Sequence, residues 1–373
     1  MGKIRFPRLT STSEELLHLD LLRFIASSGI VFLHSRVFFF PLAERAQFTS
    51  PRREGLALFV DLFFVISGFI IAYIYSGKVT NHIGYGGFLK RRIARLIPLH
   101  WLTFVISILI FWSATAVAHV HVNNLPSFHA TCLADAFFLL HGIVTCGNNN
   151  FFNGQSWSIS AEFLMYISFP VFALVASWRR WLPAIIAMLL LVVIGIYHYR
   201  AGSAVYFDWE HLYPPLRALP SFLIGVSFFH YRLDIKNIRM AKSLLLLTLV
   251  ILVAAMLGNT PPFAILLFVY LCAMFAIAAD MQGTTWRLVK KIAPLGQLTY
   301  SIYMWHGIFI ILIMNAIGDR ILHASRAPML ILAAICYGLI LLVSYFSYFY
   351  VETPARRWIN QIAAVARLPS TPG

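Results

Sequence analysis

Ionisable side chains lie within several long apolar segments of this sequence, and their chemistry is the first indication of function. Arg23 and His34 share one segment, Asp61 lies in the next, and Glu162 lies in a later one. Charge is costly inside a membrane, so such residues usually serve binding or catalysis. An imidazole can accept the proton of an attacking hydroxyl, and a carboxylate can orient that imidazole. His34 is therefore the candidate base, with Asp61 or Glu162 as its partner.

Helical spacing relates these residues to one another. Residues 23 and 34 are separated by about 16 Å along a helix and point in nearly the same direction. Arg23 and His34 are therefore expected on one face at different depths, with Asp61 and Glu162 near the depth of His34. The alternatives stay open, because His34 could be a core histidine and either carboxylate could pair with Arg217 or Arg36.

A second group of side chains is cationic. Arg92 and Arg95 are three residues apart, so they lie on one helical face. Guanidinium groups in that arrangement suit phosphate groups. Together with Arg23 they form a candidate binding site for a phosphate-bearing donor. The alternative is that these arginines only fix the orientation of the chain in the membrane.

Four further residues are candidates for contact with a substrate: Ser67, Arg217, Tyr303 and His306. Ser67 precedes a glycine, which indicates close packing between helices, although its hydroxyl could donate a hydrogen bond to a thioester oxygen. Tyr303 and His306 share a helical face by their spacing. The histidines scattered over 119–141 lack the ligand spacing of a zinc site, so no metal is expected.

Membrane-spanning helices must position all of these side chains. The chain has 373 residues, of which 60% are hydrophobic and 12% are charged, and the mean hydropathy is +0.77. Soluble domains carry about 25% charged residues. This composition excludes a disordered protein, a disulfide-rich miniprotein and an ordinary soluble enzyme. The net charge of +15 lies in short loops, which is typical of cytoplasmic loops and does not indicate nucleic-acid binding.

Ten apolar segments approach the roughly 17–25 residues that span a bilayer. They are 19–41, 57–76, 96–118, 156–178, 181–199, 214–231, 243–258, 262–279, 295–317 and 328–351. Most lysines and arginines fall in the loops on the side of the N-terminus. The sequence predicts an all-α integral membrane protein with about ten transmembrane helices and both termini cytoplasmic. The predicted parts are a cytoplasmic segment 1–18, a membrane-embedded domain 19–352 and a short cytoplasmic tail 353–373.

The first 18 residues mix charges without a long apolar core, so the first helix is expected to be retained and not cleaved as a signal peptide. Cys132 and Cys146 both fall on the side opposite the N-terminus. They could form a disulfide if that side is oxidising, and the sequence leaves this open.

Six short motifs follow one another along the chain. They are LDLLR at 19–23 with His34, DLFFVISGF at 61–69, RIARLIPLHW at 92–101, SWSISAE at 156–162, YSIYMWH at 300–306 and ETP at 352–354. In this order they resemble the acyltransferase-3 family of integral membrane O-acyltransferases. Two positions depart from the family's pattern. Leu22 stands where glycine is usual, and Phe163 stands where a second acidic residue often follows Glu162.

The resemblance implies transfer of an acyl group, commonly acetyl, from acyl-CoA (typically acetyl-CoA) to a hydroxyl of a sugar. By position, Arg23 and His34 match the family's essential pair, and Arg92 and Arg95 match its essential Arg-x-x-Arg. The implied acceptor is a cell-surface polysaccharide, a glycolipid or a related molecule. The implied location is the cytoplasmic (inner) membrane of a bacterium, with acyl-CoA on the cytoplasmic side.

Two other functions fit the same residues. Buried His, Asp, Glu and Arg also suit a proton-coupled transporter or flippase of a glycan precursor. Such proteins often carry inverted repeats and broken helix pairs, and this sequence has no clear repeat. A non-catalytic partner in polysaccharide assembly is the other alternative. Turnover of acyl-CoA would separate an enzyme from both.

Overall fold

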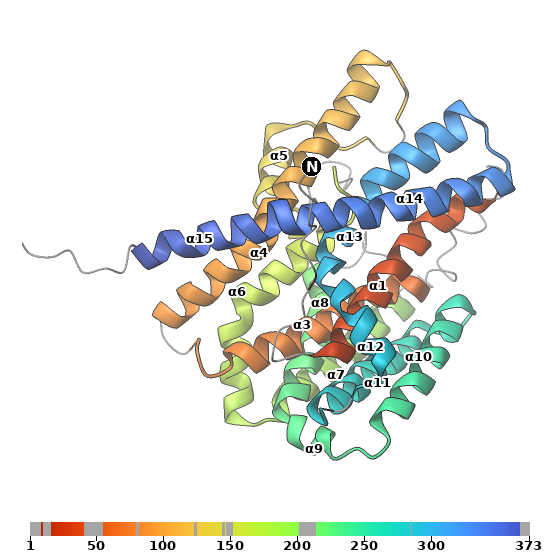
Figure 1. Cartoon of the computed structure of the whole chain (residues 1–373). Coiled ribbons are helices and arrows are strands. Elements are labelled where there is room, and N and C mark those ends of the chain that lie inside the picture. The colour runs from red at the N-terminus through yellow and green to blue at the C-terminus, as the bar shows by residue number, and fades with distance from the viewer. Residues whose placement is uncertain are drawn as a thin grey trace, which may run out of the picture.

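The computed structural model describes residues 9, 16–40, 55–79, 82–122, 125–143, 146, 152–200, 214–283 and 285–365. Within these ranges the regular elements are helices and no strand occurs. Figure 1 shows the helices gathered into one bundle. In the described part of the chain, eight helical segments are long and apolar enough to cross a membrane. The prediction of an all-α integral membrane protein is therefore confirmed.

The helices of the described bundle are α1 (Leu17–Ser35), α3 (Phe59–Tyr75), α4 (His82–Trp112), α6 (Ser156–Trp178), α7 (Leu182–Arg200), α8 (Pro214–His230), α10 (Ala241–Leu257), α11 (Pro262–Met281), α13 (Thr299–Phe309), α14 (Arg326–Ser347) and α15 (Thr353–Val365). Three helices of eight residues or fewer join them, α5 (Ala130–Phe137), α9 (Arg232–Lys236) and α12 (Arg287–Ile292), with 3₁₀ or π segments at Arg36–Phe39, Gly55–Leu58, Ser113–Val117, Ala293–Leu298, Ile310–Ile321 and Tyr348–Glu352. Two of the ten expected spans coincide with α8 and α10, which have 17 residues each. The count of ten and the cytoplasmic termini stay predictions.

The start of α1 is fixed by a carboxylate from α11. Asp280 accepts hydrogen bonds from the backbone N–H groups of His18 (2.9 Å) and Leu19 (3.1 Å), and the His18 ring lies 2.7 Å away. The first N–H groups of a helix have no partner within the helix, so this contact satisfies two of them. It sets the position of Arg23, one turn further along.

Helices α3 and α8 approach so closely that only glycine fits at two positions. A Cβ atom on Gly68 would overlap the carbonyl oxygen of Phe222, and one on Gly225 would overlap that of Val65. Small residues allow this kind of backbone approach between membrane helices. The contact fixes α3, which carries Asp61 and Ser67, against α8, which carries Arg217.

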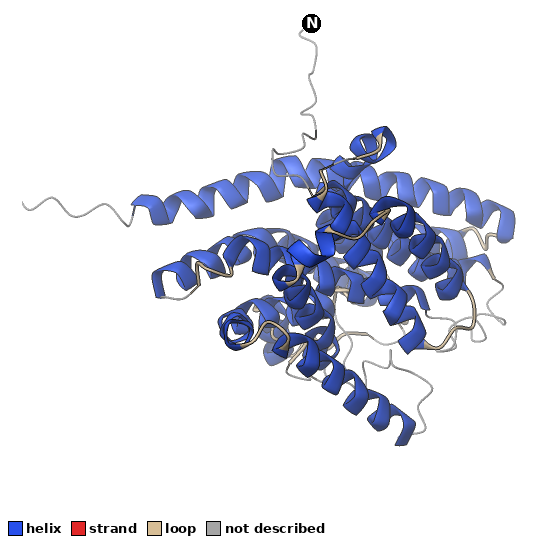
Figure 2. Cartoon of the chain, turned by 90° about the horizontal axis from the view of Figure 1, so that it is seen from below, coloured by secondary structure: helices blue, strands red, loops and turns tan. Residues whose placement is uncertain are grey.

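Helix α4 begins at His82, well before the expected span at 96–118, so the two arginines of its motif lie within it. Its first turns contact α15, where Lys90 Nζ donates to the carbonyl oxygen of Asn360 at 2.9 Å. Helices α14 and α15 follow one another as a long rod that extends past the bundle (Figures 1 and 2). The described start of the expected tail 353–373 is thus helical.

The segment between α4 and α6 packs onto the start of α6. Cys132 and Cys146 form a disulfide with 5.4 Å between their Cα atoms, which resolves the question left open by the sequence. The Ser160 hydroxyl accepts from the N–H of Gly142 at 3.1 Å. His141 lies outside the spans, and burial lowers its pKa to about 3, so its neutral ring sits 2.9 Å from the Ser156 hydroxyl. These contacts hold the SWSISAE motif in place.

Candidate active site

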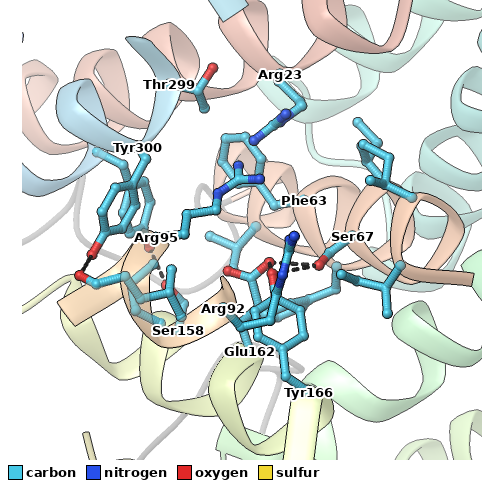
Figure 3. A pocket seen from close by; sticks show the side chains of 18 residues that line it. Arg23, Phe63, Ser67, Arg92, Arg95, Ser158, Glu162, Tyr166, Thr299 and Tyr300 are labelled. Carbon is cyan, nitrogen blue, oxygen red and sulfur yellow. Dashed lines mark hydrogen bonds between the residues drawn. The ribbon is translucent and has the colours of Figure 1, made fainter. Parts of the chain in front are cut away.

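A cavity lies where α1, α3, α4, α6 and α13 meet, and most of the sequence motifs contribute to it (Figure 3). Its walls combine apolar side chains of α3 with a concentrated set of polar groups. The polar lining residues are Arg23, Ser67, Arg92, Arg95, Ser158, Glu162, Tyr166, Thr299, Tyr300 and Tyr303. Three arginines face a single carboxylate, so this lining is cationic.

The three arginines come from two helices that are far apart in the sequence. Figure 3 shows the guanidinium groups of Arg23 and Arg95 pointing toward one another into the cavity. Arg23 Nη1 lies 3.5 Å from the Asp20 carboxylate. Arg92 is 8% exposed and donates to the Tyr75 hydroxyl at 3.2 Å. Within the described residues Arg95 makes no hydrogen bond or ion pair, so its donors are available to an anion.

Glu162 lies inside the cavity and is held by two hydroxyl groups. Ser67 donates to it at 2.6 Å and Tyr166 at 2.5 Å. The donor of Ser67 is therefore used by Glu162. Tyr166 was not singled out in the sequence, although its position four residues after Glu162 puts both on one helical face.

The tyrosines of α13 form another wall of the cavity. Tyr303 shares a 2.7 Å hydrogen bond with the Ser158 hydroxyl and meets Phe63 edge to face, with ring centroids 5.9 Å apart. Tyr300 donates to the carbonyl oxygen of Leu96 at 2.6 Å. Of the cavity-lining residues on α13, Tyr303 lies nearest to the C-terminal end of the helix. Ser158 belongs to the SWSISAE motif, yet only the fold shows that it contacts α13.

His34 lies outside the cavity lining, in the last turn of α1, and its side chain is exposed. Its Nδ1 is 2.9 Å from Nε2 of His306, a fully buried residue in the last turn of α13. The two rings are nearly parallel, with centroids 5.1 Å apart. His306 Nδ1 is 2.7 Å from the carbonyl oxygen of Tyr303. The structure thus joins two residues from opposite ends of the sequence.

Neither carboxylate expected near His34 makes contact with it. Asp61 is fully buried and pairs with Arg217 at 3.0 Å, and Ser221 donates to its other oxygen at 3.2 Å. Arg217 also donates to the carbonyl oxygen of Ala57 at 3.1 Å. Asp61 therefore has the ion-pair partner that the sequence offered as an alternative. The expected cluster of His34, Asp61 and Glu162 is not formed, because Asp61 faces α8 and Glu162 faces the arginines.

Within the described residues, no group of three or more His, Cys, Asp or Glu side chains is placed to hold a metal ion. The side chains of the site offer two kinds of chemistry. The arginine cavity can bind an anionic group. The exposed imidazole at the end of α1 can exchange a proton with a bound hydroxyl.

Comparison with known proteins gives one family. The family model Acyl_transf_3, described as an acyltransferase domain, matches residues 16–349. The exopolysaccharide production protein ExoZ of Rhizobium meliloti is 26% identical over 309 residues, which cover 80% of this chain and 89% of ExoZ.

Two further relatives match over smaller shares of their own length. The putative peptidoglycan O-acetyltransferase YrhL of Bacillus subtilis is 25% identical over 66% of this chain and 43% of its own length. The acyltransferase MdmB of Streptomyces mycarofaciens is 30% identical over 34% of this chain and 33% of its own length. The match therefore spans less than half of these two proteins. No solved structure gives a significant match.

Proposed function

The chain belongs to the acyltransferase-3 family and is a multi-pass membrane acyltransferase, and we propose that it moves an acetyl or other short acyl group from acyl-CoA to a sugar hydroxyl. One observation carries this proposal. Arg23, Arg92 and Arg95 line a single cavity, and an exposed imidazole ends the helix that carries Arg23. A phosphate-bearing donor and a proton acceptor are both needed for the reaction.

The arginine cavity is the proposed entry for acyl-CoA. The phosphates of the coenzyme carry negative charge, and guanidinium groups bind them through strong charge-assisted hydrogen bonds. Arg95 suits this role because its donors have no partner among the described side chains. Arg23 and Arg92 add positive charge beside it, while Glu162 keeps Ser67 and Tyr166 in place.

His34 is the proposed general base. The acceptor oxygen attacks the thioester carbonyl carbon as its proton passes to His34, and a C–O bond forms. The C–S bond then breaks, and the coenzyme leaves as a thiolate that takes the proton back from His34. The products are the O-acyl sugar and free coenzyme A. A positioned imidazole can accelerate such a step by about 10²–10⁴-fold.

The disulfide supports a proposed orientation in the membrane. Disulfides persist in oxidising compartments, and Cys132–Cys146 belongs to the segment that packs on the start of α6. Ser158 near that start contacts α13 close to His306. His34 would therefore face the extracytoplasmic side of the cytoplasmic membrane. The arginines would face the cytosol, where acyl-CoA is available.

The names of two relatives support a carbohydrate acceptor. One is an exopolysaccharide production protein and another is a putative peptidoglycan O-acetyltransferase. A sugar hydroxyl is a poor nucleophile at neutral pH, so a base at the extracytoplasmic end fits an acceptor in a cell-surface polysaccharide or glycolipid.

The test is release of free thiol from acetyl-CoA by membranes that contain the protein, with and without glycan extract from the host. We expect release that depends on the acceptor, and its loss in His34→Ala. His121→Ala is the matched control, because this exposed histidine lies in the loop after α4, and it should retain wild-type release. Equal release from His34→Ala and wild type would refute the role of His34. No release from well-expressed wild type with any short acyl-CoA would refute the proposed reaction.

A further inference from the structure

The hydrogen-bond partners of His306 limit what this residue can do in the site. Both nitrogens of His306 have a partner, namely the carbonyl oxygen of Tyr303 and the ring of His34. The residue is also 0% exposed. His306 therefore has no ring nitrogen left for a substrate, although it was a candidate for substrate contact.

The partner of His306 Nδ1 determines where the protons lie. A carbonyl oxygen can only accept a hydrogen bond, so Nδ1 of His306 carries the hydrogen that it donates to Tyr303. A neutral imidazole has one N–H and one lone pair. The lone pair of neutral His306 is therefore on Nε2, the atom that faces His34.

The same reasoning fixes the state of His34. Its Nδ1 must donate to the lone pair of His306 Nε2, across the 2.9 Å between them. Its own lone pair is then on Nε2, and the side chain of His34 is exposed. We propose that His306 is a positioning residue that holds His34 in the tautomer whose Nε2 accepts the proton of the acceptor hydroxyl. This inference rests on the proposed function.

The arrangement performs the task that a carboxylate performs in a Ser-His-Asp triad, where the acid fixes the tautomer and direction of the histidine. Here the partner is neutral. Among the described residues, Arg36 and the two imidazoles are the ionisable groups that act on these rings. With Arg36 nearby and His306 fully buried, a second proton on the pair is unfavourable. The pair therefore takes up one proton per transfer, at the exposed ring.

Three substitutions of His306 test this role. His306→Leu removes the acceptor for His34 Nδ1, and we expect kcat to fall about 10- to 100-fold with an unchanged KM for acetyl-CoA. His306→Gln can place its carbonyl oxygen where Nε2 was, so kcat should stay within about threefold of wild type. His306→Glu puts a negative charge beside His34 and favours its protonated form. The acid limb of its pH–rate profile should therefore move to higher pH.

His100→Gln is the matched control. His100 is another buried histidine, and it bonds to the carbonyl oxygen of Ala136 at 2.8 Å, away from the pair. Its kcat should equal that of wild type. Thermal unfolding of each purified variant in detergent reports whether the protein is folded, and kcat is compared per folded molecule. If His306→Leu does not fold, the Gln and Glu variants decide the question.

The outcomes separate the positioning role from the function. Wild-type kcat in folded His306→Leu, with inactive His34→Ala, would overturn the positioning role and leave the acyltransferase reaction intact. An equal loss in the Gln and Leu variants would also overturn it, because an acceptor alone would then not suffice. So would a pH profile in His306→Glu identical to that of wild type. No acyl-CoA turnover by wild type would refute the proposed reaction and this inference together.

Discussion

Replacement of Arg95 by alanine tests the proposed donor site most directly. Arg95 lines the cavity beside Arg23 and Arg92 and makes no hydrogen bond or ion pair with the other described residues. A hydrogen bond to a charged group contributes about 1.5–3 kcal/mol. Since about 1.4 kcal/mol corresponds to a factor of ten, KM for acetyl-CoA should rise about 10- to 100-fold. The unfolding temperature should change little, because no hydrogen bond or ion pair among the described residues is lost.

The assay is thiol release as a function of donor concentration, with acetyl-CoA and with S-acetylpantetheine, which lacks the phosphates of the coenzyme. The variant should lose much of the preference for acetyl-CoA while its KM for acetylpantetheine stays the same. Arg95→Lys keeps the positive charge but lacks the planar guanidinium group. Its KM for acetyl-CoA should therefore lie between those of wild type and the alanine variant. Arg180→Ala is the matched control, since Arg180 forms an exposed ion pair with Asp234, lies over the Tyr231 ring and does not line the cavity. An unchanged KM for acetyl-CoA, or an equal rise for both donors, would refute the phosphate-binding role of Arg95.

Two further predictions concern stability. Asp61→Ala leaves Arg217 buried without its carboxylate, which should cost about 3–5 kcal/mol; the surface variant Asp234→Ala should cost at most about 1 kcal/mol. Thermal unfolding in detergent measures both, and equal unfolding temperatures would contradict the difference. Gly225→Ala forces α3 and α8 apart and should destabilise the fold by about 1–3 kcal/mol or more, whereas Gly77→Ala, which meets open space, should be neutral. Thermal unfolding in detergent measures this difference as well. A wild-type unfolding temperature for Gly225→Ala would argue against the close approach of α3 and α8.

Much of the architecture could be predicted from the sequence because hydrocarbon admits few kinds of structure. Apolar runs of spanning length must form helices, since their backbone groups find no water partners in the bilayer. Most of the predicted spans agree with helices of the structure. The sequence did not predict the early start of α4. Its first turns contain Lys90 and the motif arginines, so they lack the apolar composition of a membrane span. That stretch is helical where it packs against α15.

Residues that share one face of a single helix could also be predicted from their spacing in the sequence. Arg92 and Arg95 share a face by their three-residue separation, and both line the cavity. The disulfide could not be established from the sequence, because two cysteines must come within a few ångströms of one another and the sequence does not give that distance. Cys132 and Cys146 meet because the segment after α5 folds back.

Which helices face one another was decided only by the tertiary structure. In a soluble helix the apolar stripe marks the side that packs, but in a membrane both the lipid side and the packed side are apolar. The sequence therefore identified His34, Asp61 and His306 as residues capable of chemistry, without assigning their partners. The rotation and neighbours of α1, α3 and α13 bring Asp61 to Arg217 and His306 to His34.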